Sequence, residues 1–207
     1  MRRLAGLVAL VLLVLLGLVM PLAQAVAAPP GTPAAHASGD TLARGAKDGK
    51  APAWAIDVAT PAGWTRDCCK YARGIGVDAV LYRGEWTGKP QRVMVLNVWP
   101  RKLPTLQAEL DADRKHYLLL DPDAKTSSFP IPHAAMPCRA TVYEGSDHVD
   151  DVVAFCDPGT ASGVRLSWSM SFNDNDPQRQ TLLDDFMDVV VATHWRRDTG
   201  DSRAGAR

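Results

Sequence analysis

The sequence lacks an excess of charge of either sign. It contains 23 Lys and Arg residues against 23 Asp and Glu residues, which gives a formal net charge of +0 at pH 7. Because a nucleic-acid-binding face needs a basic surplus, this balance argues against a nucleic-acid partner. A second long apolar run is also missing after the one at the N-terminus, so we expect no stable membrane span once that first run is removed.

The common catalytic and cofactor motifs are absent as well. The sequence contains no Gly-x-Ser-x-Gly, no His-Glu-x-x-His and no glycine loop of the kind that cradles a phosphate. We therefore predict no catalytic residue, no cofactor and no metal site. His148 with Asp147, Asp150 and Asp151 could hold a divalent cation, but the same residues are typical of a polar turn, and we adopt that interpretation.

The N-terminus has the pattern of a secretory signal peptide over residues 1–28. Arg2 and Arg3 precede the uncharged apolar run Leu4–Met20, and small residues at Ala23–Ala27 offer a cleavage site. The alternative is a retained membrane anchor, although this run is at the short end for crossing a bilayer. The sequence thus predicts an exported protein, periplasmic or extracellular.

Composition divides the remaining chain into three parts. Residues 29–52 are rich in Ala, Pro and Gly with almost no large apolar side chain, so we predict a disordered linker. Residues 53–195 have the length and pattern of one folded domain. Residues 196–207 resemble the linker in composition and are predicted to be a disordered tail.

The clearest structural signal is a strand at Val164–Phe172. Five apolar residues alternate there with four polar ones, which is typical of a strand with one buried face. The segments 54–58, 78–82, 92–99, 138–143 and 152–156 are further predicted strands. Proline and the apolar spacing predict helices over 104–121 and from Pro177 onward, where Asp176 caps the helix. The predicted fold class is α+β, a single antiparallel β-sheet with two main helices packed on it.

Two segments carry a resemblance to a known family. The opening Thr-Pro-Ala-Gly-Trp at Thr60–Trp64 and the closing helix Phe-Met-Asp-Val-Val-Val-Ala-Thr-His-Trp at Phe186–Trp195, with the order of elements between them, resemble the PsbP-like superfamily. That group includes the photosystem II extrinsic subunit and the bacterial DcrB-like proteins. The resemblance implies an antiparallel sheet between helices and a role in binding or assembly, with no shared catalytic residue.

The four cysteines favour disulfides because the chain is predicted to be exported. Cys138 and Cys156 lie at equal distances from residue 147 in the predicted turn, so they face each other if the hairpin has that register. Cys68 and Cys69 are adjacent and have three open possibilities: a vicinal disulfide, two free thiols, or one bridge to the hairpin region.

The predicted function is that of an exported, non-catalytic binding or assembly module of the cell envelope, whose partner is a protein or another envelope component. Its candidate binding surface consists of Trp86 in a turn and the polar row Ser167, Ser169 and Ser171. An alternative function is a thiol-redox protein of the envelope that uses Cys68 and Cys69.

Overall fold

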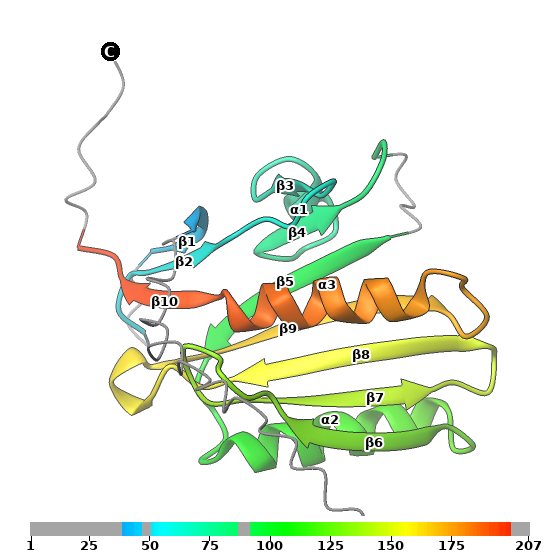
Figure 1. Ribbon diagram of the computed structural model, residues 1–207. Coiled ribbons are helices and arrows are strands. Elements are labelled where there is room, and N and C mark those ends of the chain that lie inside the picture. Colours follow the sequence, from blue (N-terminus) through cyan, green and yellow to red (C-terminus); the bar gives the residue numbers. More distant parts are fainter. Residues whose placement is uncertain (1–38, 47–50, 87–91, 200–207) are drawn as a thin grey trace, which may run out of the picture. The chain divides into compact units, whose positions relative to one another are not determined.

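Strand pairing divides the folded part into two antiparallel sheets. The computed structural model describes residues 39–46, 51–86 and 92–199 (Figure 1). One sheet has the order β1-β2-β10 and contains Asp40–Gly45, Trp54–Val58 and His194–Arg197. The other has the order β3-β4-β5-β9-β8-β7-β6. Its strands, in chain order, are Thr65–Asp67, Ala79–Tyr82, Val93–Pro100, Lys125–Pro130, Cys138–Glu144, Val149–Cys156 and Val164–Asn173.

The α+β class is confirmed, but the prediction of a single sheet is wrong. Strand β2 pairs with β1 and β10 instead of joining the larger sheet. Strand β1 lies inside residues 29–52, which were predicted to be a disordered linker, and β10 continues past residue 195 into the predicted tail. Both partners of β2 therefore come from segments whose composition gave no strand signal. The predicted signal peptide, residues 1–28, lies outside the described residues.

The two main helices lie close to where the sequence placed them. Helix α2, Leu106–Leu120, begins after Thr105, whose side chain accepts a hydrogen bond from the Ala108 N–H at 3.1 Å. Helix α3, Arg179–Val191, begins later than its predicted start at Pro177, and its N-cap is Gln178 in place of the predicted Asp176, whose carboxylate accepts the Gln178 N–H at 2.7 Å. The helix also ends before His194 and Trp195, which pair with β2 in β10. Two short helices were not predicted, α1 at Tyr71–Gly74 and a 3₁₀ turn, η1, at Thr160–Ser162. No helix in the described ranges combines the length and apolarity that crossing a bilayer requires.

Helices α3 and α2 lie on opposite faces of the larger sheet (Figure 1), and the alternation along β9 points successive side chains to one face or the other. Leu166, Trp168 and Met170 are buried in the hydrophobic core, together with Leu182 and Phe186 of α3. The intervening residues point to the opposite face, where α2 packs over β7 and β8. We call the first the α3 face and the second the α2 face. The serine row of β9 lies on the α2 face.

The hairpin of β7 and β8 has the register that the cysteine spacing predicted. Cys138 is paired with Cys156, and the turn falls between Glu144 and Val149. Strand β6, which follows α2, was not among the predicted strands. It pairs with β7 and forms one edge of the larger sheet.

Candidate functional site

The serine row is unevenly covered. Ser167 is 7% exposed, Ser169 is half-buried and Ser171 is exposed. The register places Ser169 opposite Val95 of β5 and opposite Val153 of β8. Since α2 packs over β7 and β8, the cover it gives ends part-way across the sheet. The hydroxyl face predicted from the sequence is therefore open only at the end of β9 that carries Ser169 and Ser171.

A groove of about 440 Å³ runs along this open end. Its floor contains Val93 and Val95 of β5 beside Ser169 and Ser171 of β9, and we call these four residues the β5–β9 strip. Both valines are only half-buried. The strip thus offers apolar contact and hydroxyl groups side by side, which suits a partner with both kinds of surface.

Asp151 of β8 organises the polar groups between the strip and α2. Its carboxylate accepts hydrogen bonds from Ser171 Oγ and, at 2.8 Å, from Tyr117 Oη of α2. Tyr143 Oη donates to Asp113 of α2 at 2.5 Å. Burial and these carboxylate partners raise the pKa of both tyrosines, so both remain protonated donors. These contacts hold α2 on the sheet. The sequence had placed Asp151 with His148 in a polar turn, whereas it lies in strand β8.

Trp86 borders the strip as part of an aromatic cluster. Its ring stacks on Tyr71 of α1, with centroids 4.7 Å apart, and meets the edge of Tyr82 at 5.4 Å. Tyr82 is the register partner of Val93, so the cluster adjoins the strip along β4. Trp86 is half-buried. The tyrosines were not predicted to belong to the surface, because they become neighbours of Trp86 only through the fold.

Under α2, the buried guanidinium of Arg165 lies between two carboxylates. Arg165 is 0% exposed, forms an ion pair with Asp157, and has its Nε 3.7 Å from Glu109 of α2. Burial raises the pKa of Glu109. Burial also acts to raise the pKa of Asp157, but a Gly159 N–H, Arg101 and Arg165 together lower it below its usual value. These charges neutralise one another, so we assign them to the packing of α2.

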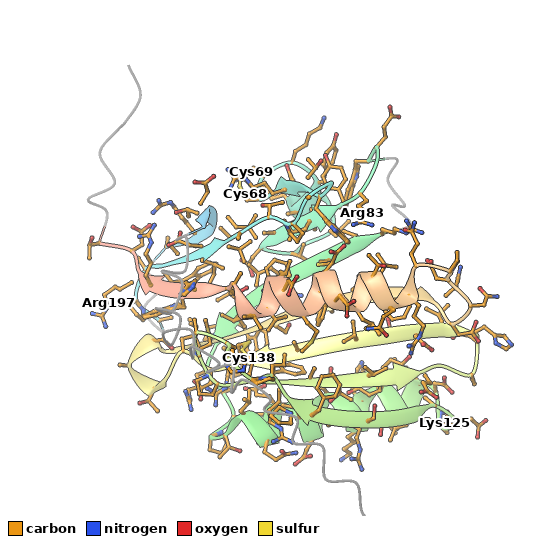
Figure 2. All side chains as sticks on the ribbon, in the orientation of Figure 1. Cys68, Cys69, Arg83, Lys125, Cys138 and Arg197 are labelled. Carbon is orange, nitrogen blue, oxygen red and sulfur yellow. A yellow bond between two sulfur atoms is a disulfide. The ribbon has the colours of Figure 1, made fainter. Side chains whose placement is uncertain are left out.

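The two disulfides have different surroundings. Cys138 and Cys156 join neighbouring strands in the core and are 5% and 0% exposed. Cys68 and Cys69 are bonded to each other in the turn between β3 and α1, at a different place in the structure (Figure 2). Of this adjacent pair, Cys68 is half-buried and Cys69 is exposed. Of the three possibilities that the sequence left open, the structure has the vicinal disulfide.

No protein-family profile matches this chain, and no curated protein matches it in sequence. Solved structures do match. LpqN of Mycobacterium tuberculosis, a protein involved in cell envelope biogenesis, superposes with a TM-score of 0.50 and 14% identity, over 72% of this chain and 87% of that chain. The cyanobacterial PsbP protein, CyanoP, of Synechocystis sp. PCC 6803 superposes with a TM-score of 0.46 and 14% identity, over 74% and 92%.

The fold is PsbP-like. The resemblance inferred from Thr60–Trp64 and Phe186–Trp195 is confirmed at the level of fold. An identity of 14% supports no transfer of residues or of activity. The assignment of residues to a function in this PsbP-like domain must therefore come from its own side chains.

Proposed function

We propose that this chain is an exported, non-catalytic binding module of the cell envelope, and that its partner contacts the β5–β9 strip. The observation that carries the proposal is the incomplete cover of the α2 face. Val93 and Val95 remain half-buried there, in register with the open end of the serine row. Apolar side chains left partly exposed beside a groove are the kind of surface that a partner can cover.

The polar contacts beside the strip support binding rather than catalysis. Ser171 donates to the Asp151 carboxylate. A serine nucleophile needs a positioned base such as histidine, and a carboxylate is a weak base toward an alcohol. Asp151 also accepts a hydrogen bond from Tyr117, and this contact holds α2 in place. The hydroxyl groups are therefore suited to hydrogen bonding with a partner.

Three further observations support placing the module in the cell envelope. The N-terminal pattern of residues 1–28 is that of a secretory signal peptide. The described part contains two disulfides, which persist in oxidising compartments. LpqN, which has the same type of fold, is involved in cell envelope biogenesis. An envelope component is the partner class most compatible with these three observations.

Photo-crosslinking in intact cells tests the proposal. A photoreactive amino acid at Ser169 should give a discrete crosslinked product, because this side chain lies on the strip. The same group at Thr181, exposed on α3, is the control for random collisions. Substitution Ser171→Arg should abolish the Ser169 product by filling the groove. The matched change Ser127→Arg, at an exposed strand serine outside the groove, should leave it unchanged.

Two results would refute the assignment. Equal products from Ser169 and Thr181 would show that the strip is not a preferred contact. A Ser169 product that survives Ser171→Arg would show that the partner does not occupy the groove. Circular dichroism of each variant must match the unsubstituted protein, so that unfolding is not mistaken for loss of binding.

A further inference from the structure

The vicinal disulfide has no part in the strip. Cys68 packs against the edge of the core, but Cys69 is exposed, so the pair differs from Cys138–Cys156 in access. A thiolate in solvent can reach the exposed Cys69 sulfur, whereas the sulfurs of Cys138 and Cys156 are covered by the sheet and its core. We infer that the Cys68–Cys69 bond is a reversible thiol–disulfide exchange site, which dithiols reduce while the Cys138–Cys156 bond stays closed. This inference is independent of the proposed binding function.

The turn that carries the vicinal pair is held by a carboxylate. Asp67 Oδ1 accepts hydrogen bonds from the backbone N–H groups of Cys69 at 3.2 Å, Tyr71 at 2.7 Å and Ala72 at 3.0 Å. The N–H of Lys70 donates to both carboxylate oxygens, at 3.1 and 3.2 Å. Burial acts to raise the pKa of Asp67, but these backbone bonds outweigh it and lower the pKa.

It follows that the sulfur–sulfur bond is not needed to shape the turn. None of the four backbone N–H groups bound to Asp67 depends on a sulfur atom, so we expect these hydrogen bonds to persist when the bond opens. Asp67 also lies in β3, which is paired with β4 through Val80. Opening the bond therefore leaves the backbone in place, so the reduced and oxidised forms interconvert without unfolding.

The surroundings of the pair favour departure of a negatively charged sulfur. A pocket of about 470 Å³ is lined by Cys68 and Cys69 together with Arg44 and Arg73. Arg44 is paired with Asp198 at 2.7 Å, so Arg73 is the guanidinium that we expect to stabilise a departing thiolate and so improve it as a leaving group. The acidic group in the same pocket is Asp78. Burial raises its pKa, and its carboxylate accepts a backbone N–H of β5 at 2.6 Å.

The exchange proceeds in two displacements. One thiolate of the dithiol attacks Cys69 Sγ, the sulfur–sulfur bond breaks, and its electron pair leaves on Cys68 Sγ, which takes a proton. The second thiolate of the donor then attacks the donor's own sulfur in the mixed disulfide and releases Cys69, which is protonated in turn. Two electrons and two protons pass to the protein, and the donor leaves as its disulfide.

Graded reduction of the exported protein tests the inference. The oxidised protein is equilibrated with a series of dithiothreitol concentrations, acid-quenched, alkylated and mapped by peptide mass spectrometry. We expect Cys68 and Cys69 to be alkylated at dithiothreitol concentrations at least about tenfold lower than those that open Cys138–Cys156. The far-ultraviolet circular dichroism should be unchanged over that interval. Opening of both bonds together, or opening of the vicinal bond only as the protein unfolds, would overturn the inference.

A pair of arginine variants tests the leaving group. Arg73→Gln should slow reduction by a fixed concentration of dithiothreitol about threefold or more, because it removes a positive charge beside the departing sulfur. Arg66→Gln is the matched control, since Arg66 is paired with Asp40 at 3.1 Å and does not line this pocket. Equal rates for the two variants would show that Arg73 does not assist the departing sulfur.

Discussion

Removing the two disulfides one at a time should cost very different amounts of stability. A disulfide stabilises a fold mainly by reducing the conformational entropy of the unfolded chain, and the effect grows with the number of residues in the loop that the bond closes. Cys138 and Cys156 are 18 residues apart in sequence. A loop of that size corresponds to about 3 kcal/mol at 25 °C. Cys68 and Cys69 are one residue apart, so closing their bond restricts almost nothing beyond the peptide link itself.

The test compares two double variants by urea denaturation. Cys138→Ala with Cys156→Ala should lower the free energy of unfolding by about 3 kcal/mol, plus a smaller amount for the two buried sulfur atoms removed. Cys68→Ser with Cys69→Ser should lower it by less than about 1 kcal/mol, because Asp67 continues to hold the turn. For a domain of this length the first change corresponds to a fall in Tm of roughly 6–12 °C.

Either of two results would refute this reasoning. A loss of less than about 1 kcal/mol for the hairpin pair would mean that the unfolded chain is already restricted without the bond. A loss of about 3 kcal/mol for the vicinal pair would mean that the sulfur–sulfur bond, and not Asp67, determines the turn. The second result would also remove the structural basis for reversible reduction, because the reduced turn would then rearrange.

Three further predictions concern charged groups. Arg165→Met should destabilise the protein by about 3–5 kcal/mol in urea denaturation, because Glu109 and Asp157 lose the cation between them; the double change with Glu109→Met should recover part of that loss. The pKa of Asp157 is lowered in the fold from 3.8, so its stabilisation is present above about pH 4 and is lost as the pH falls through the lowered pKa; Asp157→Asn should flatten this acid limb of the stability profile. Asp174 raises the pKa of His148, so Asp174→Asn should lower it in an NMR titration, and an unchanged midpoint would contradict the 2.8 Å contact.

The central strands and both main helices could be predicted from the local pattern of apolar and polar residues. The strand at Val164–Phe172 could be predicted from its own residues, because the alternation of apolar and polar side chains places all the apolar ones on the face that meets the core. The facing positions of Cys138 and Cys156 follow from a hairpin whose turn is local. In each case the residues that decide the structure lie within one element or one turn.

The elements that were missed depend on partners remote in sequence. Strand β1 is half polar, and β10 contains two arginines, so neither has an apolar rhythm. Both are strands because β2 offers them backbone hydrogen bonds, and β10 comes from the other end of the domain. Strand β6 is likewise an exposed edge that pairs with β7 alone. Pairing of this kind is a tertiary effect that single-sequence propensity does not register.

The extent of the candidate surface depends on α2, and that explains why the serine row was only partly located. The spacing of Ser167, Ser169 and Ser171 shows that they share one face of the sheet. It does not show which of them a helix covers. The position of α2 determines which serines are covered, and the hydrogen bond from Tyr117 to Asp151 helps to fix where α2 crosses the sheet. If α2 lay one strand closer to β5, Ser169 would be covered and no groove would remain. The availability of the strip is therefore set by hydroxyl–carboxylate contacts between α2 and the sheet, and substitutions that weaken them should alter binding without touching the strip itself.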